Sequence, residues 1–91
     1  MDDLRKKFSE AAKIISSKKN TMPKSVYCAY VDHLSDINTE DLPEDIQIIY
    51  ESVDMRINST VPPGDIANDE AGYLAKDILY MADVLKARYQ P

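Results

Sequence analysis

Hydrophobic residues recur at intervals of three and four along this chain in four stretches, and polar residues fill most positions between them. That spacing is typical of amphipathic helices that bury one face. It predicts four helices, at residues 2–18, 23–35, 43–58 and 66–89. The faces expected to be buried are Leu4, Phe8, Ala11 and Ile15; Val26, Tyr30 and Leu34, widened by Tyr27 and Val31; Leu42, Ile46, Ile49, Tyr50, Val53 and Ile57; and Ala71, Leu74, Ile78, Met81 and Leu85.

The clearest break in this pattern is residues 59–64, where two adjacent prolines forbid helix continuation and a glycine supplies a turn. The stretch at 23–35 is the most ambiguous, because it is short and rich in β-branched and aromatic residues. A strand is the alternative there, but the period is nearer 3.6 than 2 and favours a helix.

Several residues at the helix ends match known capping preferences. Thr21 is expected to cap the second helix and Asn68 the fourth, while Asp41 with Glu44 resembles a capping box ahead of the third. Gly72 falls inside the fourth helix, where glycine is costly. It marks either a close helix crossing or merely the nearby helix start.

Length and composition favour a single all-α domain over residues 1–91. The chain has 91 residues, of which 44% are hydrophobic, and it contains only two glycines. That is enough to bury one modest core without a metal or a disulfide. No Asn-Gly or Asp-Gly hairpin signal is present. We therefore expect a compact bundle of about four helices with short loops, most simply in up-down order.

The location expected from the sequence is the cytoplasm. The first residues carry charges without the apolar segment of a secretory signal. No apolar stretch approaches the roughly 20 residues that a membrane span needs, so we expect no membrane insertion. The lone cysteine, Cys28, fits a reducing compartment.

The charge is unevenly distributed along the chain. Residues 1–24 hold seven basic and three acidic residues, a balance of +4, and residues 25–91 hold four basic and thirteen acidic residues, a balance of −9. Together they give the net charge of −5. The protein thus has a basic head and an acidic body.

The best metal-binding pattern is incomplete. Asp36, Asn38 and Glu40 begin like a calcium-binding loop. The sixth position is Asp41, where the loop needs glycine, and the twelfth is Gln47, where it needs a bidentate glutamate. We interpret the segment as an acidic loop and expect no metal.

Catalysis is not indicated either. His33 with Asp36 supplies only two ligands, whereas structural zinc takes four. Cys28 and His33 are the only cysteine and histidine, and no glycine-rich turn accompanies them to stabilise an oxyanion. Phosphate-binding glycine loops are missing, so no nucleotide cofactor is suggested. We expect a protein without enzymatic activity or cofactor.

The basic first helix supports one functional hypothesis. Its charges lie mostly away from the buried face and could meet phosphates, and the residues concerned are Arg5, Lys6, Lys7 and Lys13. The acidic body disfavours binding of nucleic acid, because it would repel a polyanion. Nucleic-acid binding is therefore the alternative function, and docking of the basic helix on the acidic body of its own chain or of a neighbouring copy stays open.

A second apolar stripe on two helices supports the leading hypothesis. Ile48 and Met55 repeat seven residues apart on the third helix, and Tyr73 and Tyr80 do so on the fourth, with Val84 following. Each helix of a small bundle needs only one buried stripe. Either the core is unusually wide, or these residues meet a partner. We expect a small adaptor, regulator or inhibitor that acts through protein contacts, most simply as a homodimer.

Overall fold

The computed structural model describes residues 2–17, 21–60 and 65–88, and within those ranges it contains helices and no strand. The elements are α1 (Asp2–Ser16), α2 (Met22–Ala29), the π-helical turn η1 (Tyr30–Leu34), the 3-10 turn η2 (Thr39–Asp41), α3 (Glu44–Asn58) and α4 (Asn68–Arg88). The described part of the chain therefore confirms the predicted all-α bundle of four helices with short loops.

The helix limits differ from the predicted ones by one or two residues at most ends. α1 ends at Ser16 rather than at residue 18. Just after it, the Ser17 hydroxyl donates a hydrogen bond of 2.8 Å to the Ile14 carbonyl, one of the last carbonyls of the helix. Residues 18 and 89, where the predicted first and fourth helices end, lie outside the described residues.

The stretch predicted as one helix over 23–35 is helical throughout, so the strand alternative is wrong. It changes type part-way, because α2 passes directly into the wider turn η1. The change is visible at Ser35, whose N–H donates to the Tyr30 carbonyl five residues back, at 2.8 Å. A π-helical turn rotates the residues after it relative to an α-helix, and it carries Tyr30 and Leu34 toward α3.

One of the three predicted caps stands where expected and two do not. Thr21 is at the cap position of α2, although its side chain makes no capping hydrogen bond and its carbonyl accepts the Ser25 N–H at 2.9 Å. Pro43 stands at the cap position of α3, so Asp41 lies two residues too early for a capping box and belongs to η2. Asn68 is the first residue of α4 rather than the residue before it.

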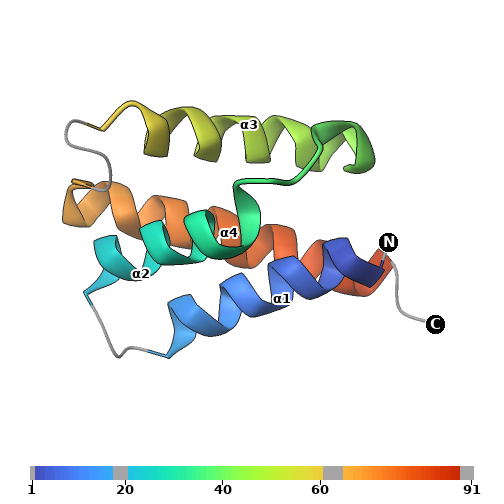
Figure 1. Ribbon diagram of the computed structural model, residues 1–91, viewed down its shortest axis with the longest axis horizontal. Coiled ribbons are helices and arrows are strands. Elements are labelled where there is room, and N and C mark those ends of the chain that lie inside the picture. Colours follow the sequence, from blue (N-terminus) through green and yellow to red (C-terminus); the bar gives the residue numbers. More distant parts are fainter. Residues whose placement is uncertain (1, 18–20, 61–64, 89–91) are drawn as a thin grey trace.

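The four helices alternate in direction along the chain, with α4 at the centre (Figure 1). α4 packs against α1, α2 and α3, and α2 also packs against α1. α3 lies on the other side of α4 from α1 and meets the end of η1. The bundle is flattened, with extents of 38 × 25 × 19 Å. α4 thus packs against each of the other three α-helices. In a square four-helix bundle, by contrast, each helix packs mainly against two neighbours.

The predicted faces form the core, with three exceptions. Ile49 and Tyr27 are half-buried at its edge, and Val31, expected to widen the stripe of the second helix, is 45% exposed. Ile66, just before α4, is an additional core residue at 5% exposure. Burial of these side chains supplies the main force that holds the helices together.

Gly72 lies in α4 with nothing within 4 Å of the position that a Cβ would occupy. A close helix crossing at this residue is therefore excluded. We expect Gly72→Ala to raise the free energy of unfolding by about 0.5–1 kcal/mol, because alanine loses less backbone freedom in a helix. Thermal unfolding followed by circular dichroism measures the change. A lower midpoint for the variant would contradict the open surroundings of this residue.

Candidate interaction surfaces

The largest exposed hydrophobic side chains gather on α3 and α4. Ile48 is 67% exposed, Met55 68%, Tyr73 62% and Tyr80 53%. We name these four residues the α3–α4 patch. They are not part of the core, so an unusually wide core does not explain them.

Two ion pairs fix how α3 and α4 lie side by side. At one end the Arg88 guanidinium donates to both carboxylate oxygens of Asp45, at 3.0 and 2.7 Å. At the other end Arg56 lies 3.4 Å from Glu70. The Arg88 hydrogen bonds also lower the pKa of the Asp45 carboxyl from its ordinary value. The helices are therefore antiparallel, with the start of α3 beside the end of α4.

This register relates the turns that carry the exposed residues. Met55 is next to Arg56 in the chain and Tyr73 is three residues after Glu70, so the turns that carry them lie near the same ion pair. Ile48 is three residues after Asp45, toward the other ion pair. On each helix the two patch residues are seven apart and share a face. Four side chains of this size offer on the order of a few hundred Å², the size of the largest apolar patch on a typical monomer, which is often functional.

Val84 behaves differently from the four residues of the α3–α4 patch. It is half-buried and packs against the core. It therefore lies at the edge of the patch rather than within it. The predicted set of five residues thus divides into four exposed side chains and one at the boundary.

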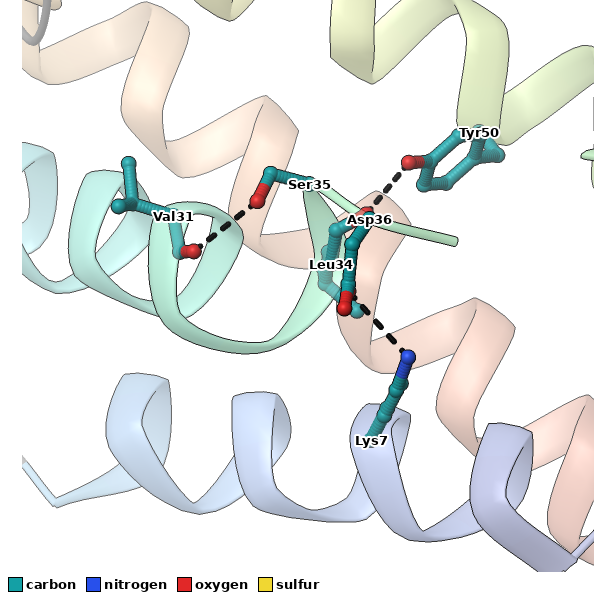
Figure 2. Close-up of polar contacts among 6 residues, drawn as sticks. All are labelled: Lys7, Val31, Leu34, Ser35, Asp36 and Tyr50. Carbon is teal, nitrogen blue, oxygen red and sulfur yellow. Dashed lines mark hydrogen bonds and ion pairs between the residues drawn. The ribbon is translucent and has the colours of Figure 1, made fainter. Parts of the chain in front are cut away.

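The basic residues of α1 do not act as one group. Arg5, Lys6 and Lys13 line a groove of about 910 Å³ between α1 and α4, together with Lys86 of α4. Lys7 turns to another side of the helix, where its ammonium lies 3.2 Å from a carboxylate oxygen of Asp36 (Figure 2). Three of the four predicted residues are brought together, and the fourth is not.

We name the space between these helices the α1–α4 groove. Small and apolar side chains contribute to its wall, among them Ala12, Leu79 and Ala82. Two acidic residues, Glu10 and Asp83, also line it. The contribution of Lys86 could not be read from the sequence pattern, because it lies on a helix 70 and more residues further along the chain.

The acidic loop after η1 uses its polar groups for local contacts. Asp36 pairs with Lys7, and the Asn38 side-chain oxygen accepts the Glu40 N–H at 3.1 Å. His33 is half-buried on η1, and Cys28 is half-buried on α2. Across residues 2–17, 21–60 and 65–88, no three side chains of the metal-binding types come together.

Two buried tyrosines connect η1 to α3. The Tyr50 hydroxyl donates to the Leu34 carbonyl (Figure 2), and the Tyr30 hydroxyl donates to the Asp54 carboxylate. Asn58 donates in turn to the Tyr30 oxygen, at 3.2 Å. Burial raises the pKa of both tyrosine hydroxyls above the ordinary value of 10.0, and the hydrogen bond to Asp54 adds to the effect at Tyr30. The two tyrosine side chains are buried, at 5% and 3% exposure, so their hydrogen bonds serve to join η1 to α3.

No family model, no curated protein and no solved structure matches this chain. None of the helices in the described ranges has the length and apolar character needed to cross a bilayer. The two surfaces described above, the apolar α3–α4 patch and the basic α1–α4 groove, are the candidate functional sites of the protein.

Proposed function

We propose that this protein acts through protein–protein contacts in the cytoplasm, without catalysis, and that it binds a second copy of itself through the α3–α4 patch. The observation that carries the proposal is the exposure of Ile48, Met55, Tyr73 and Tyr80, all above half, on two adjacent helices. Leaving four such side chains in water costs free energy, and covering them with a partner recovers it.

A two-fold dimer is the simplest arrangement that covers this patch. In such a dimer the same surface of both copies meets, so the patch needs no second complementary site. Tyrosine suits the position, because its ring packs against apolar groups while its hydroxyl stays hydrated at the rim. A stable interface buries about 800 Å² per partner, so the patch would form the centre and the polar residues around it the rim.

We propose no catalysis because the cysteine and histidine side chains do not form a catalytic group with a third residue in the described part of the chain. Nucleophilic catalysis needs a nucleophile, a base and an orienting group within hydrogen-bond reach of one another. The chain has one cysteine and one histidine, and both are half-buried on consecutive turns of one helical stretch. The two remaining surfaces are suited to contacts rather than to chemistry.

Sedimentation equilibrium over a range of micromolar concentrations tests the proposal. We expect the native chain to form a dimer, and the double variant Tyr73→Ala, Tyr80→Ala to weaken the dimer at least tenfold, which corresponds to about 1.4 kcal/mol. Both side chains are exposed, so the variant keeps the fold, and its circular dichroism spectrum should be unchanged.

The matched control is Val31→Ala on η1, which removes methyl groups from a side chain that is 45% exposed but lies outside the α3–α4 patch. It should dimerise like the native chain. A native chain that stays monomeric at every concentration would refute the proposal. So would a dimer that the two tyrosine replacements leave unchanged.

A further inference from the structure

The α1–α4 groove differs in chemistry from the α3–α4 patch and lies along another side of α4. Its positive charges come from Arg5, Lys6, Lys13 and Lys86. Its apolar surface includes Leu79, which is 37% exposed. A groove that combines exposed apolar surface with positive charge suits a ligand that has both an apolar side and negative charges.

The charge of the groove is opposite to that of the protein as a whole. Four basic and two acidic residues line it, on a chain whose net charge is −5. Glu10 is already paired with Lys13, at 3.5 Å. Lys6 and Lys86 have no ion-pair partner among the described residues. The groove is therefore a local positive region that attracts anionic groups.

The dimensions of the groove match a short helix. Its α1 wall runs from Arg5 to Ser16, which is three turns, or about 17 Å at a rise of 1.5 Å per residue. Ser9, Ala12 and Ser16 are small, and Ala82 faces them from α4. Small side chains at the contact let helix axes approach to about 8 Å. A third helix can therefore lie along the surface of the groove, over both α1 and α4.

We infer that the α1–α4 groove binds an acidic amphipathic helix of another protein. The apolar stripe of that helix packs on Leu79 and Ala82, and its carboxylates pair with Lys6 and Lys86. This is the general mode in which an amphipathic helix fills a groove. The charges select acidic helices over basic ones and speed the encounter.

Nucleic acid fits the same groove less well. A duplex carries a phosphate about every 1.7 Å and needs a continuous basic surface. Glu10 and Asp83 interrupt the basic residues here, and the acidic body of the chain surrounds them. Phosphates also gain nothing from the apolar surface at Leu79. A short DNA duplex is therefore used as a second probe, beside the acidic peptide, in the experiment below.

The test is an NMR titration of the isotope-labelled full chain with a synthetic helix of about 12 residues, long enough to span three turns. The probe carries leucines on one face and glutamates on the others. We expect amide shifts confined to α1 and the second half of α4, and affinity that falls as salt is added. The double variant Lys6→Glu, Lys86→Glu should lose at least tenfold in affinity. Both lysines are exposed, so circular dichroism should show an unchanged fold.

The matched control is Lys76→Glu, an exposed lysine of α4 outside the groove, which should bind the peptide like the native chain. A peptide with glutamine in place of glutamate should bind at least tenfold more weakly. The inference is overturned by no shifts, by shifts elsewhere, by equal binding of the glutamine peptide, or by binding of a short DNA duplex in place of the peptide.

This inference can fail separately from the proposed dimer. The variant Lys6→Glu, Lys86→Glu should sediment as the native chain does. The variant Tyr73→Ala, Tyr80→Ala should still bind the acidic helix, because neither tyrosine lines the groove.

Discussion

Replacing Phe8 with alanine lowers the free energy of unfolding by about 3–5 kcal/mol. Phe8 is the only phenylalanine in the chain and is fully buried, at 0% exposure. It stands on α1 where that helix packs against both α2 and α4. Removing its ring therefore opens a cavity among three helices, none of which can move in without losing contacts to the others.

Urea unfolding followed by circular dichroism measures this loss. A domain of this size has a total stability of about 5–10 kcal/mol, so the variant should be near the limit of folding at room temperature. Val31→Ala is a matched control on an exposed side chain and should change stability by less than about 1 kcal/mol. A loss below about 2 kcal/mol for Phe8→Ala would mean that the core at this position collapses easily, contrary to the packing described.

Replacing Tyr50 with phenylalanine should cost about 1–3 kcal/mol, the second largest effect we expect. The Tyr50 ring is 3% exposed, and its hydroxyl donates to the Leu34 carbonyl at the end of η1. Phenylalanine keeps the ring but removes the hydroxyl donor, so the Leu34 carbonyl retains only the longer bond from the Ile37 N–H, at 3.4 Å. Tyr80→Phe is the matched control, because the Tyr80 side chain is 53% exposed and its hydroxyl can bond water.

The buried hydroxyl of Tyr50 also makes the free energy of unfolding depend on pH. Burial raises the folded-state pKa of Tyr50, and also that of Tyr30, above the unfolded value near 10. The unfolded chain therefore loses these protons first. Stability from this source is complete below about pH 10 and declines as pH rises further. Unfolding measured from pH 8 to pH 11 should show a shallower decline for Tyr50→Phe than for the native chain. Equal slopes would contradict the buried position of this hydroxyl.

The apolar pattern predicted the helices and their buried faces because both depend on local spacing. Leu4, Phe8 and Ile15 face inward for the same reason that Leu74 and Ile78 do, since each set repeats at the period of one helix face. The caps were predicted less well. A capping residue depends on where the first turn begins, and that point shifts by one or two residues according to tertiary contacts and prolines such as Pro43.

The two candidate surfaces were predictable to different degrees. The sequence shows that Ile48 and Tyr73 lie off the buried faces of their own helices. It does not show that α3 packs against α4. Lys7 and Lys6 are adjacent in the chain and look alike, yet one pairs with Asp36 and the other lines the groove. Adjacent residues of a helix point about 100° apart, so the neighbouring helices decide which surface each side chain joins.

Residue types and their spacing are enough to show that this chain is helical, which faces of its helices are mostly buried and that its charges divide into a basic head and an acidic body. Those properties are carried by single residues and by spacing within one helix. The packing of the helices was needed to show that α4 is the central helix, that the second stretch turns through η1 toward α3, and that α1 and α4 form a groove. Such features depend on contacts between residues far apart in the chain, and those contacts follow from how the apolar faces pack together in three dimensions.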